Sequence, residues 1–319
     1  MAINRYSQDS PIILNKVHPD DFCCIVVLHN PNLSSFRNIF HQFEKNFNKI
    51  IIVTNGIVES IGDLVSGNVH IIINQKNQGL AKAINQGISK AKDMDCNMVA
   101  LFDQDTKINN NFLESMVIDI NNYNGNKRIA LYSPRYKNST TGKISQNIYL
   151  KLFHFVKKND DERYSYPYYS ITSGSIIPMK IFDKIGVMKE ELFMDYIDIE
   201  WCLRARNYNY EIISLNKVLV EHSIGERGQK IFGRKFTIHA PERMYYYFRN
   251  SIFLYKIKYL DINWKLADFI RNTLRFIFYI TFVNKRFMYL KNIIQGYWHG
   301  LVGKMGGKES NENREGRNS

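Results

Sequence analysis

The chain has 319 residues, of which 45% are hydrophobic and 23% are charged, the balance of a folded protein rather than of a disordered or fibrous one. Its four cysteines contain no C-x-x-C pair, which argues against a disulfide framework and against a zinc site. The net charge is +13, and residues 243–304 hold eleven basic and two acidic residues together with 17 aromatic residues. A basic, aromatic segment suits an acidic partner, either anionic lipid or nucleic acid.

The rest of the chain is only mildly basic, which argues against a protein that is coated for nucleic-acid binding. The opening residues are polar and mixed, so no secretory leader is expected. No apolar run reaches the roughly 20 residues that a membrane-spanning helix needs.

The first half of the chain alternates short apolar runs with helical patterns. The apolar runs predict strands that are buried on both faces, at residues 23–28, 50–53, 69–73 and 98–102. Amphipathic spacing predicts helices at residues 33–47 and 80–91. This alternation indicates a mainly parallel sheet, in which ligands bind beyond the carboxyl ends of the strands. Asn30, Asn55 and residues 103–105 fall at those ends.

The second half follows a different rhythm. Polar stretches at residues 137–147 and 157–163 are interpreted as loops, and an apolar strand at 171–178 is interrupted by Ser173-Gly174-Ser175. Residues 197–207 are predicted to form a helix with a Glu200–Arg204 pair one turn apart. Two or three amphipathic helices are expected beyond residue 241, and the polar end of the chain is expected to be a disordered tail.

Asp103 and Asp105 follow a predicted buried strand and are separated by one residue. Two carboxylates placed in this way can converge on one hard divalent cation, Mg²⁺ or Mn²⁺, and such a cation would neutralise a diphosphate. His222, at the end of another predicted strand, offers a third ligand suited to manganese. Acids are also common in turns after strands, and a lone histidine near a turn is more often a structural residue.

Asp195, Asp198 and Glu200 lie within six residues of one another among apolar neighbours, where unpaired charge is costly. A carboxylate in a partly apolar cleft can act as a general base with a raised pKa. Alternatively, Asp198 caps the helix that follows and Glu200 pairs with Arg204. This alternative accounts for Glu200 well, for Asp198 in part and for Asp195 poorly.

Residues 77–87 begin a predicted helix directly after a strand. Gly79 permits a close backbone approach, and the positive end of a helix favours an anion. The spacing matches no phosphate-binding loop, so this segment alone is a weak signal.

Taken in order, these segments resemble the family 2 glycosyltransferases of the GT-A fold, and among them the bacterial rhamnosyltransferases that build O-antigens of lipopolysaccharide and related surface polysaccharides. The resemblance covers about residues 23–225. The family's Asn-x-Gly-x-Ala-x-x-x-Asn-x-Gly pattern is matched by Asn77, Gly79, Ala81, Asn85 and Gly87. Its DXD-type motif is matched by Asp103-Gln104-Asp105. Its Asp-x-Asp/Glu-x-x-x-Arg segment is matched by Asp198, Glu200 and Arg204, and its late histidine is matched by His222.

The resemblance implies an α/β GT-A fold, a Rossmann-like and mainly parallel sheet flanked by helices, with a C-terminal helical extension. We therefore expect a polar segment at residues 1–20, the catalytic domain at 21–240, amphipathic and membrane-associating helices at 241–304, and a disordered tail at 305–319.

The resemblance also implies roles for single residues. Donor binding is assigned to Asn30, Asn55, Asn77, Gly79, Lys82, Asn85 and Asp103. The Mg²⁺ or Mn²⁺ ligands are expected to be Asp103, Asp105 and His222, and the acceptor side to be formed by Ser173, Gly174 and Glu200. The reaction implied is a single displacement with inversion at the anomeric carbon.

Two departures from the family pattern matter. The family's second strand often ends Val-Asp-Asn-Gly, whereas this chain has Thr54 in place of the acid. The sequence therefore does not decide whether the site recognises uridine or thymidine. The usual Glu-Asp pair is also altered, because Ile197 precedes Asp198. Asp198 is then the base by position, with Asp195 as its competitor one turn earlier.

The implied substrates are a nucleotide-sugar donor, with dTDP-rhamnose first and a UDP-sugar as the alternative, and a glycan linked to polyprenyl diphosphate. An acceptor of this kind places the protein on the inner face of the cytoplasmic membrane, bound to anionic lipid and not to nucleic acid. The C-terminal aromatic side chains either lie in the lipid interface or pack against the domain. Two other classes stay open: a basic lipid- or nucleic-acid-binding protein with degenerate catalysis, and a nucleotidyltransferase, although residues 29–32 form no glycine-rich phosphate loop.

Overall fold

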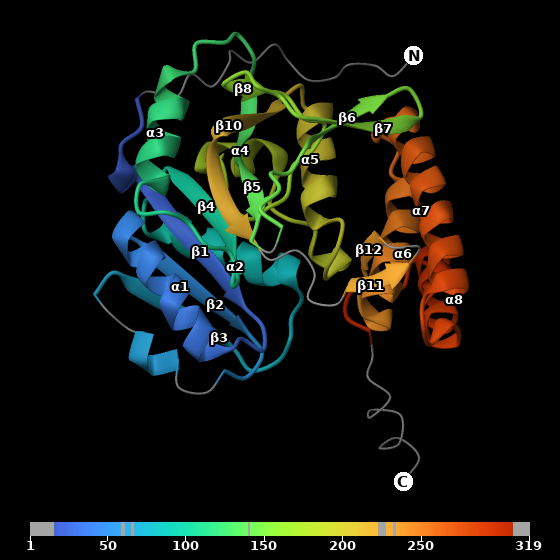
Figure 1. The fold of residues 1–319 in the computed structure, drawn as a ribbon. Coiled ribbons are helices and arrows are strands. Elements are labelled where there is room, and N and C mark those ends of the chain that lie inside the picture. Colours follow the sequence, from blue (N-terminus) through green and yellow to red (C-terminus); the bar gives the residue numbers. More distant parts are fainter. Residues whose placement is uncertain are drawn as a thin grey trace.

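The computed structural model describes residues 16–58, 61–64, 67–139, 141–222, 228–231 and 234–308, and its centre is an eight-stranded sheet in the order β3-β2-β1-β4-β9-β5-β10-β8 (Figure 1). The strands of this sheet are β1 (Phe22–Leu28), β2 (Ile50–Asn55), β3 (Val69–Asn74), β4 (Met98–Asp103), β5 (Ile129–Asn138), β8 (Tyr164–Ser165), β9 (Ser175–Pro178) and β10 (Glu211–His222). β9 runs antiparallel to both of its neighbours and β8 antiparallel to β10, whereas the other pairs are parallel. The predicted α/β fold with a mainly parallel sheet is therefore confirmed.

The alternation of side chains along β1 shows how the sheet is enclosed. Cys23, Ile25 and Val27 pack into one apolar cluster, and Cys24 and Val26 pack into a second cluster on the opposite face. Helices cover both faces, because a strand whose residues are all buried needs a partner on each side. The covering helices are α2 (Leu80–Asp93), α4 (Met179–Ile185) and α5 (Ile197–Asn207) on one face, and α1 (Leu33–Asn46) and α3 (Phe112–Asn122) on the other.

The first four predicted strands and both predicted helices are confirmed, with shifts of a few residues at their ends. The polar stretches that were interpreted as loops are in part strands. The stretch at 137–147 contains the end of β5, and a hairpin of β6 (Asn147–Lys151) and β7 (His154–Lys158) follows it. These two strands lie outside the main sheet and are only partly buried, so they lack the long apolar run that identifies a strand buried on both faces.

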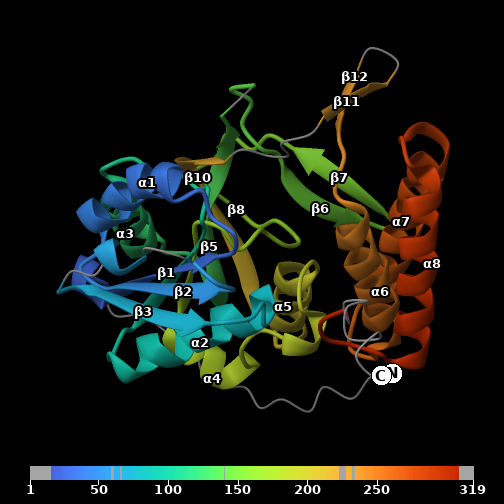
Figure 2. The ribbon, with the colours of Figure 1, turned by 90° about the horizontal axis from the view of Figure 1, so that it is seen from below.

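Three C-terminal helices, α6 (Pro241–Lys256), α7 (Ile262–Phe282) and α8 (Arg286–Val302), stand beside α5 at the end of the molecule remote from β3 (Figures 1 and 2). α6 and α8 pack closely because Gly296 and Gly300 have no side chains. A Cβ atom on Gly296 would lie 2.5 Å from the Tyr245 carbonyl oxygen, and one on Gly300 would lie 2.6 Å from the Arg249 carbonyl oxygen. The remaining elements are the hairpin of β11 (Gly228–Ile231) and β12 (Arg234–Thr237) and the short helices η1 (Pro19–Asp21), η2 (Ile61–Leu64) and η3 (Glu190–Leu192).

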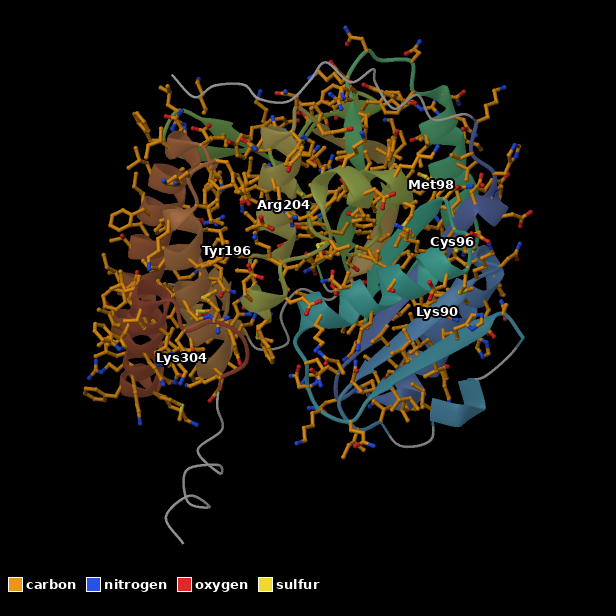
Figure 3. The ribbon with its side chains drawn as sticks, turned by 180° about the vertical axis from the view of Figure 1, so that it is seen from behind. Lys90, Cys96, Met98, Tyr196, Arg204 and Lys304 are labelled. Carbon is orange, nitrogen blue, oxygen red and sulfur yellow. The ribbon has the colours of Figure 1, made fainter. Side chains whose placement is uncertain are left out.

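A buried polar network joins the C-terminal helices to the sheet domain. The Tyr196 hydroxyl, at the start of α5, donates to the Asp268 carboxylate of α7, 2.9 and 3.1 Å from its two oxygens. Tyr255 of α6 donates to the same carboxylate at 2.7 Å, and Asn272 of α7 donates to the Tyr196 hydroxyl at 2.9 Å. Tyr196 lies at this junction in Figure 3. The three helices are therefore fixed on the domain by hydrogen bonds that water does not reach.

Four residues of the expected disordered tail, residues 305–308, have a defined structure. Residues 309–319 lie outside the described part of the chain, but residues 305–308 are docked on α6 and η3. Gly306 donates its amide to the Glu191 carbonyl at 2.9 Å, and its carbonyl accepts from Arg249. Lys308 donates its backbone amide to the Tyr246 hydroxyl at 2.8 Å and its ammonium group to Asn292 at 2.7 Å. Composition does not reveal this segment, because polar contacts and a single apolar residue, Met305, hold it against the domain.

Candidate active site

The turn after β4 carries the Asp103-Gln104-Asp105 triplet and is held from two sides. The Asp103 amide donates to the Ser173 hydroxyl at 3.1 Å, and that hydroxyl is 2.5 Å from the hydroxyl of the fully buried Thr106. The Gln104 side chain accepts from the His29 amide at 2.8 Å and donates to the His29 carbonyl at 3.2 Å, which ties the turn to the end of β1. The half-buried Asp103 and Asp105 are thus fixed at the carboxyl edge of the sheet.

A second segment, between η3 and α5, brings Asp195 to the same site in a strained conformation. Phe193, Asp195 and Tyr196 have φ angles of 64°, 59° and 63°, in the left-handed region. Each non-glycine residue in this region costs about 1 kcal/mol, so the segment must be held in place. Asn250 of α6 does so by donating its side-chain amide to three carbonyls of residues 192–195, at 2.7–3.0 Å.

Gly79 admits this segment rather than a ligand. The Phe193 carbonyl accepts from the Leu80 amide at 2.6 Å and from the Ala81 amide at 3.4 Å, so it occupies the first turn of α2. Gly79 has a φ of 90°, and a Cβ atom there would lie 2.6 Å from the Phe193 ring. The expected donor contact at Gly79 is therefore wrong, because the protein's own backbone fills the position where an anion was expected.

The asparagines of the same pattern also make internal contacts. Asn55 accepts from the Gln78 amide at 2.7 Å, and Asn77 accepts from the Gly79 amide at 2.9 Å. Asn85 donates to the Met188 carbonyl and accepts from its amide, both at 2.9 Å, which fixes the loop before η3. These contacts give the three asparagines positioning roles.

Two of the expected donor contacts lie closer to solvent. Asn30 is exposed at the end of β1, with a φ of 45°, and Lys82 is half-buried in the first turn of α2. Their assignment to the donor stays a prediction.

The predicted acceptor residues are structural. Glu200 is completely buried, accepting from Arg204 at 2.9 Å and from the Tyr259 hydroxyl at 2.7 Å. The predicted pair with Arg204 is confirmed, and the acceptor role of Glu200 is wrong, because an acceptor cannot reach this carboxylate. Ser173 is 3% exposed and supports the Asp103 turn. Gly174, with a φ of 78°, lies so close to Pro134 that a Cβ atom would be 2.8 Å from its ring, so neither residue forms an acceptor surface.

Arg243, in the first turn of α6, connects the acidic residues of the site. Its guanidinium donates to the Asp195 carboxylate through three contacts of 3.0–3.2 Å, and the Asp195 side chain is 10% exposed. The pKa of Arg243 is raised above its usual value first by the charge of Asp195, and then by the charges of Asp198 and Asp103. Arg243 is therefore bonded to Asp195 of the strained segment and lies within the electrostatic influence of Asp198 on α5 and Asp103 on β4.

Asp198 has the electrostatic character of a general base. Burial raises its pKa from 3.8 to about 6; the charges of Asp195 and Asp103 act in the same direction, and the Ile199 amide, 2.9 Å away, opposes the shift. The apolar side chains of Ile177 and Trp201 line a small cavity against it. A carboxylate with a pKa near 6 is ionised at neutral pH and holds a proton far better than an exposed aspartate does.

Two further residues of the site, Tyr136 and His239, were not singled out by the sequence analysis. Tyr136, near the end of β5, has a pKa raised first by burial and then by the charge of Asp198. His239, just before α6, has a pKa lowered to about 4 by burial and by the charge of Arg243, so its ring is neutral at pH 7. No local signal marks these residues or Arg243, because their partners lie far away in the sequence.

The metal ligands predicted from the sequence are partly placed. Within the described side chains, no three histidine, cysteine, aspartate or glutamate residues converge in a way that could hold a metal ion. The His222 side chain is outside that set, but its backbone ends β10, next to Glu221. Lys107 and Glu221 form an antiparallel bridge of two 2.8 Å hydrogen bonds, which brings this end of β10 beside the turn of Asp103 and Asp105. Two carboxylates and an imidazole suit Mn²⁺ or Mg²⁺ that is completed by substrate phosphates and water.

The sequence of this chain is similar to those of known glycosyltransferases. Residues 24–186 match the sequence profile of the family described as "Glycosyl transferase family 2". The dTDP-rhamnosyl transferase RfbF of Shigella flexneri is 26% identical over 291 residues, which are 90% of this chain and 97% of that protein.

Two solved structures share the fold. One is residues 1–349 of TarS from S. aureus, with a TM-score of 0.58 and 15% identity over 89% of this chain and 81% of that chain. The other is GalNAc-T7 with UDP, GalNAc and Mn²⁺, with a TM-score of 0.54 and 14% identity over 79% of this chain. The present chain covers only about half, 54%, of the GalNAc-T7 chain.

Proposed function

Because the chain belongs to glycosyl transferase family 2, a family whose GT-A members typically use a divalent metal, we propose that it moves L-rhamnose from dTDP-rhamnose to a lipid-linked glycan. The nature of the donor is supported by the similarity to a dTDP-rhamnosyl transferase along almost the whole length of both chains. A UDP-sugar is the alternative donor, because Thr54, 1% exposed, takes the place of the acid that is common at the end of β2.

The observation that carries the proposal is the contrast between Asp195 and Asp198. Both lie in the acidic cluster, but Asp195 is clamped by Arg243, whereas Asp198 has a pKa of about 6. Asp198 is therefore the base. It takes the proton of the acceptor hydroxyl while the acceptor oxygen forms a bond to the anomeric carbon. The bond from that carbon to the diphosphate oxygen breaks, and the nucleoside diphosphate leaves with the electron pair.

Asp103, Asp105 and His222 would hold the divalent cation, which when bound offsets the negative charge of the leaving diphosphate. Gln104 and Ser173 keep the two aspartates in place through the backbone. The Asp195–Arg243 pair keeps the strained segment next to Asp198 and lowers the net negative charge around the base.

The C-terminal helices supply a surface for the lipid-linked acceptor. Within the described residues, no helix is long and apolar enough to span a bilayer. α7 nevertheless exposes an apolar stripe at helical spacing along its whole length, formed by Ile262, Leu266, Phe269, Ile270, Leu274, Ile277 and Phe282. α8, which packs beside it, adds Phe287, Ile294, Trp298 and Leu301. We call these exposed side chains of α7 and α8 the apolar face.

Charge decides which partner suits the apolar face best. Within residues 262–308 the exposed charged residues are all basic, namely Lys285, Arg286, Lys291 and Lys304, and the single acidic residue, Asp268, is completely buried. Two copies of such a surface would repel each other, and a nucleic acid would match the charge but not the apolar side chains. Anionic lipid matches both, since each basic side chain near such a surface contributes about 1 kcal/mol. We therefore place the protein on the inner face of the cytoplasmic membrane as a peripheral protein.

Vesicle binding tests this location. The protein should float with vesicles that contain phosphatidylglycerol but not with pure phosphatidylcholine vesicles. Phe269→Glu combined with Leu274→Glu should abolish flotation, while Ile118→Glu, an equally exposed apolar position on α3, should leave it unchanged. Equal flotation of the double variant would refute lipid docking, and a dimer in light scattering that the same variant dissociates would assign the face to a second copy.

A screen of nucleotide sugars tests the activity. With Mn²⁺, dTDP-rhamnose should raise the melting temperature and be hydrolysed slowly to dTDP, and Asp198→Asn should still bind the donor. Stabilisation by UDP-sugars alone would replace the proposed donor, and a response to none of them would remove the function.

A further inference from the structure

A hollow of about 290 Å³ lies at the carboxyl end of β5, and Tyr136, Ile144 and Ile148 form its apolar walls. It is formed where the chain turns back after β5 and enters the β6–β7 hairpin. Two exposed lysines, Lys143 and Lys157, line it together with the amides of Asn138 and Gln146 and the hydroxyl of Ser145. Among the described residues that line it, none is acidic. Its chemistry therefore suits a ligand that carries both hydroxyl groups and negative charge.

The hollow is next to the proposed active site. Asn138, one of its lining residues, pairs in the sheet with His222 at the end of β10. Tyr136, which also lines the hollow, is close enough to Asp198 for the charge of that carboxylate to raise the pKa of the phenol. The hollow lies on the half of the sheet that contains β5 and β10. β1 and β2 lie on the other side of β4. Tyr136 is therefore the residue that connects the hollow with the proposed base.

Buried polar side chains fix the backbone segments that form the hollow. Arg135 of β5, 6% exposed, donates to the carbonyls of Ser145 and Asp160, and so holds both the returning chain and the end of the hairpin. Asn147, at the start of β6, donates to the Asp160 carboxylate at 2.8 Å and to Asn216 of β10 at 3.0 Å. The site is therefore built before a ligand arrives, which lowers the entropic cost of binding.

The hairpin also connects the hollow to the C-terminal helices. The Arg271 guanidinium of α7 lies over the Phe155 ring of β7, 4.8 Å from its centre, and donates to the Tyr169 hydroxyl at 2.8 Å. Figure 2 shows β6 and β7 extending from the sheet domain toward α7. The hairpin that lines part of the hollow is thus also in contact with α7, the helix that carries much of the apolar face.

We propose that this hollow binds the anionic part of the acceptor, a phosphate or carboxylate group attached to the sugar, with Lys143 and Lys157 as its counter-charges. The inference rests on the proposed function, because a lipid-linked acceptor carries a diphosphate next to its first sugar. An acidic sugar within the glycan would offer the same chemistry through a carboxylate.

Small soluble probes test the inference without the lipid chain. Binding of glucose 1-phosphate, glucuronic acid and glucose is measured by NMR titration in the presence of EDTA, which removes any contribution from a bound metal. One or both anionic probes should bind at least about tenfold more tightly than glucose. Lys143→Gln combined with Lys157→Gln should remove that difference. A preference for glucose 1-phosphate identifies the carrier phosphate as the source, and a preference for glucuronic acid identifies an acidic sugar.

The control is Lys45→Gln, an exposed lysine on α1, which should leave binding of the anionic probes unchanged. Equal binding of all three probes to the wild-type protein, or anionic binding that survives in the double variant, would overturn the inference. Donor hydrolysis by the wild-type protein is measured in parallel. Normal hydrolysis without anionic binding would refute the hollow alone, whereas a wild-type protein that hydrolyses no donor would refute the proposed function instead.

Discussion

Asp198→Asn should abolish sugar transfer and at the same time stabilise the protein at neutral pH. Burial raises the pKa of Asp198 from 3.8 to about 6, so the folded state holds its proton more tightly than the unfolded chain does. Stability linked to this residue is therefore highest below pH 4 and declines as the pH rises to 6. A shift of about two pKa units corresponds to about 3 kcal/mol, which ionised Asp198 costs the fold at pH 7. The neutral amide avoids this cost.

The assay is thermal or urea unfolding of the wild-type protein and of the variant at pH 4 and pH 8, in the absence of metal. The variant should be more stable at pH 8 and nearly equal to the wild-type protein at pH 4. In the wild-type protein, kcat/KM should fall about tenfold for each unit of pH below 6, because the base must be ionised. An Asn variant that is destabilised at pH 8, or a flat activity profile between pH 5 and 8, would refute the assignment of Asp198 as a buried base.

Three other substitutions separate the roles of neighbouring residues. Asp195→Asn should destabilise the protein by about 1 kcal/mol in urea unfolding, because it removes the partner of a half-exposed arginine, so a stabilising effect would contradict the ion pair. Arg243→Gln should shift the acid limb of the pH–activity profile to higher pH, since it removes a cation beside Asp198; an unshifted limb would show that Arg243 does not act on the base. Gly79→Ala should cost about 2 kcal/mol through its clash with Phe193, whereas Gly62→Ala, with open space around it, should have little effect on the melting temperature.

Local sequence patterns were enough to predict the sheet and the position of the turn that carries Asp103 and Asp105. β1, β2 and β4 are short apolar runs that are buried on both faces, a pattern typical of the central strands of a parallel sheet. An acidic triplet directly after β4 must then lie at the carboxyl edge of the sheet. The pattern of charges among apolar neighbours marked Asp195, Asp198 and Glu200 alike, and only the family resemblance favoured Asp198 as the base.

Contacts between distant residues were beyond these patterns. Gly79 was singled out correctly as a place of close approach, but the group that approaches is Phe193, more than a hundred residues later. The sequence shows Arg243 only as one member of a basic segment. Its ion pair with Asp195 forms only when the chain folds. Spacing predicts that a helix has two faces without fixing which one is buried. α7 is the clearest case, because Asp268 and Asn272 are buried while Phe269 is exposed.

The central claim is that Asp103, Asp105 and Asp198 act together to release a sugar from a nucleotide. Metal-dependent formation of dTDP from dTDP-rhamnose, compared between the wild-type protein and Asp105→Ala, tests it most directly. The account predicts turnover that Mn²⁺ supports in the wild-type protein and that is lost in the variant, while the melting temperature in the absence of metal stays unchanged. Full turnover by the variant, or wild-type turnover that EDTA does not diminish, would contradict it.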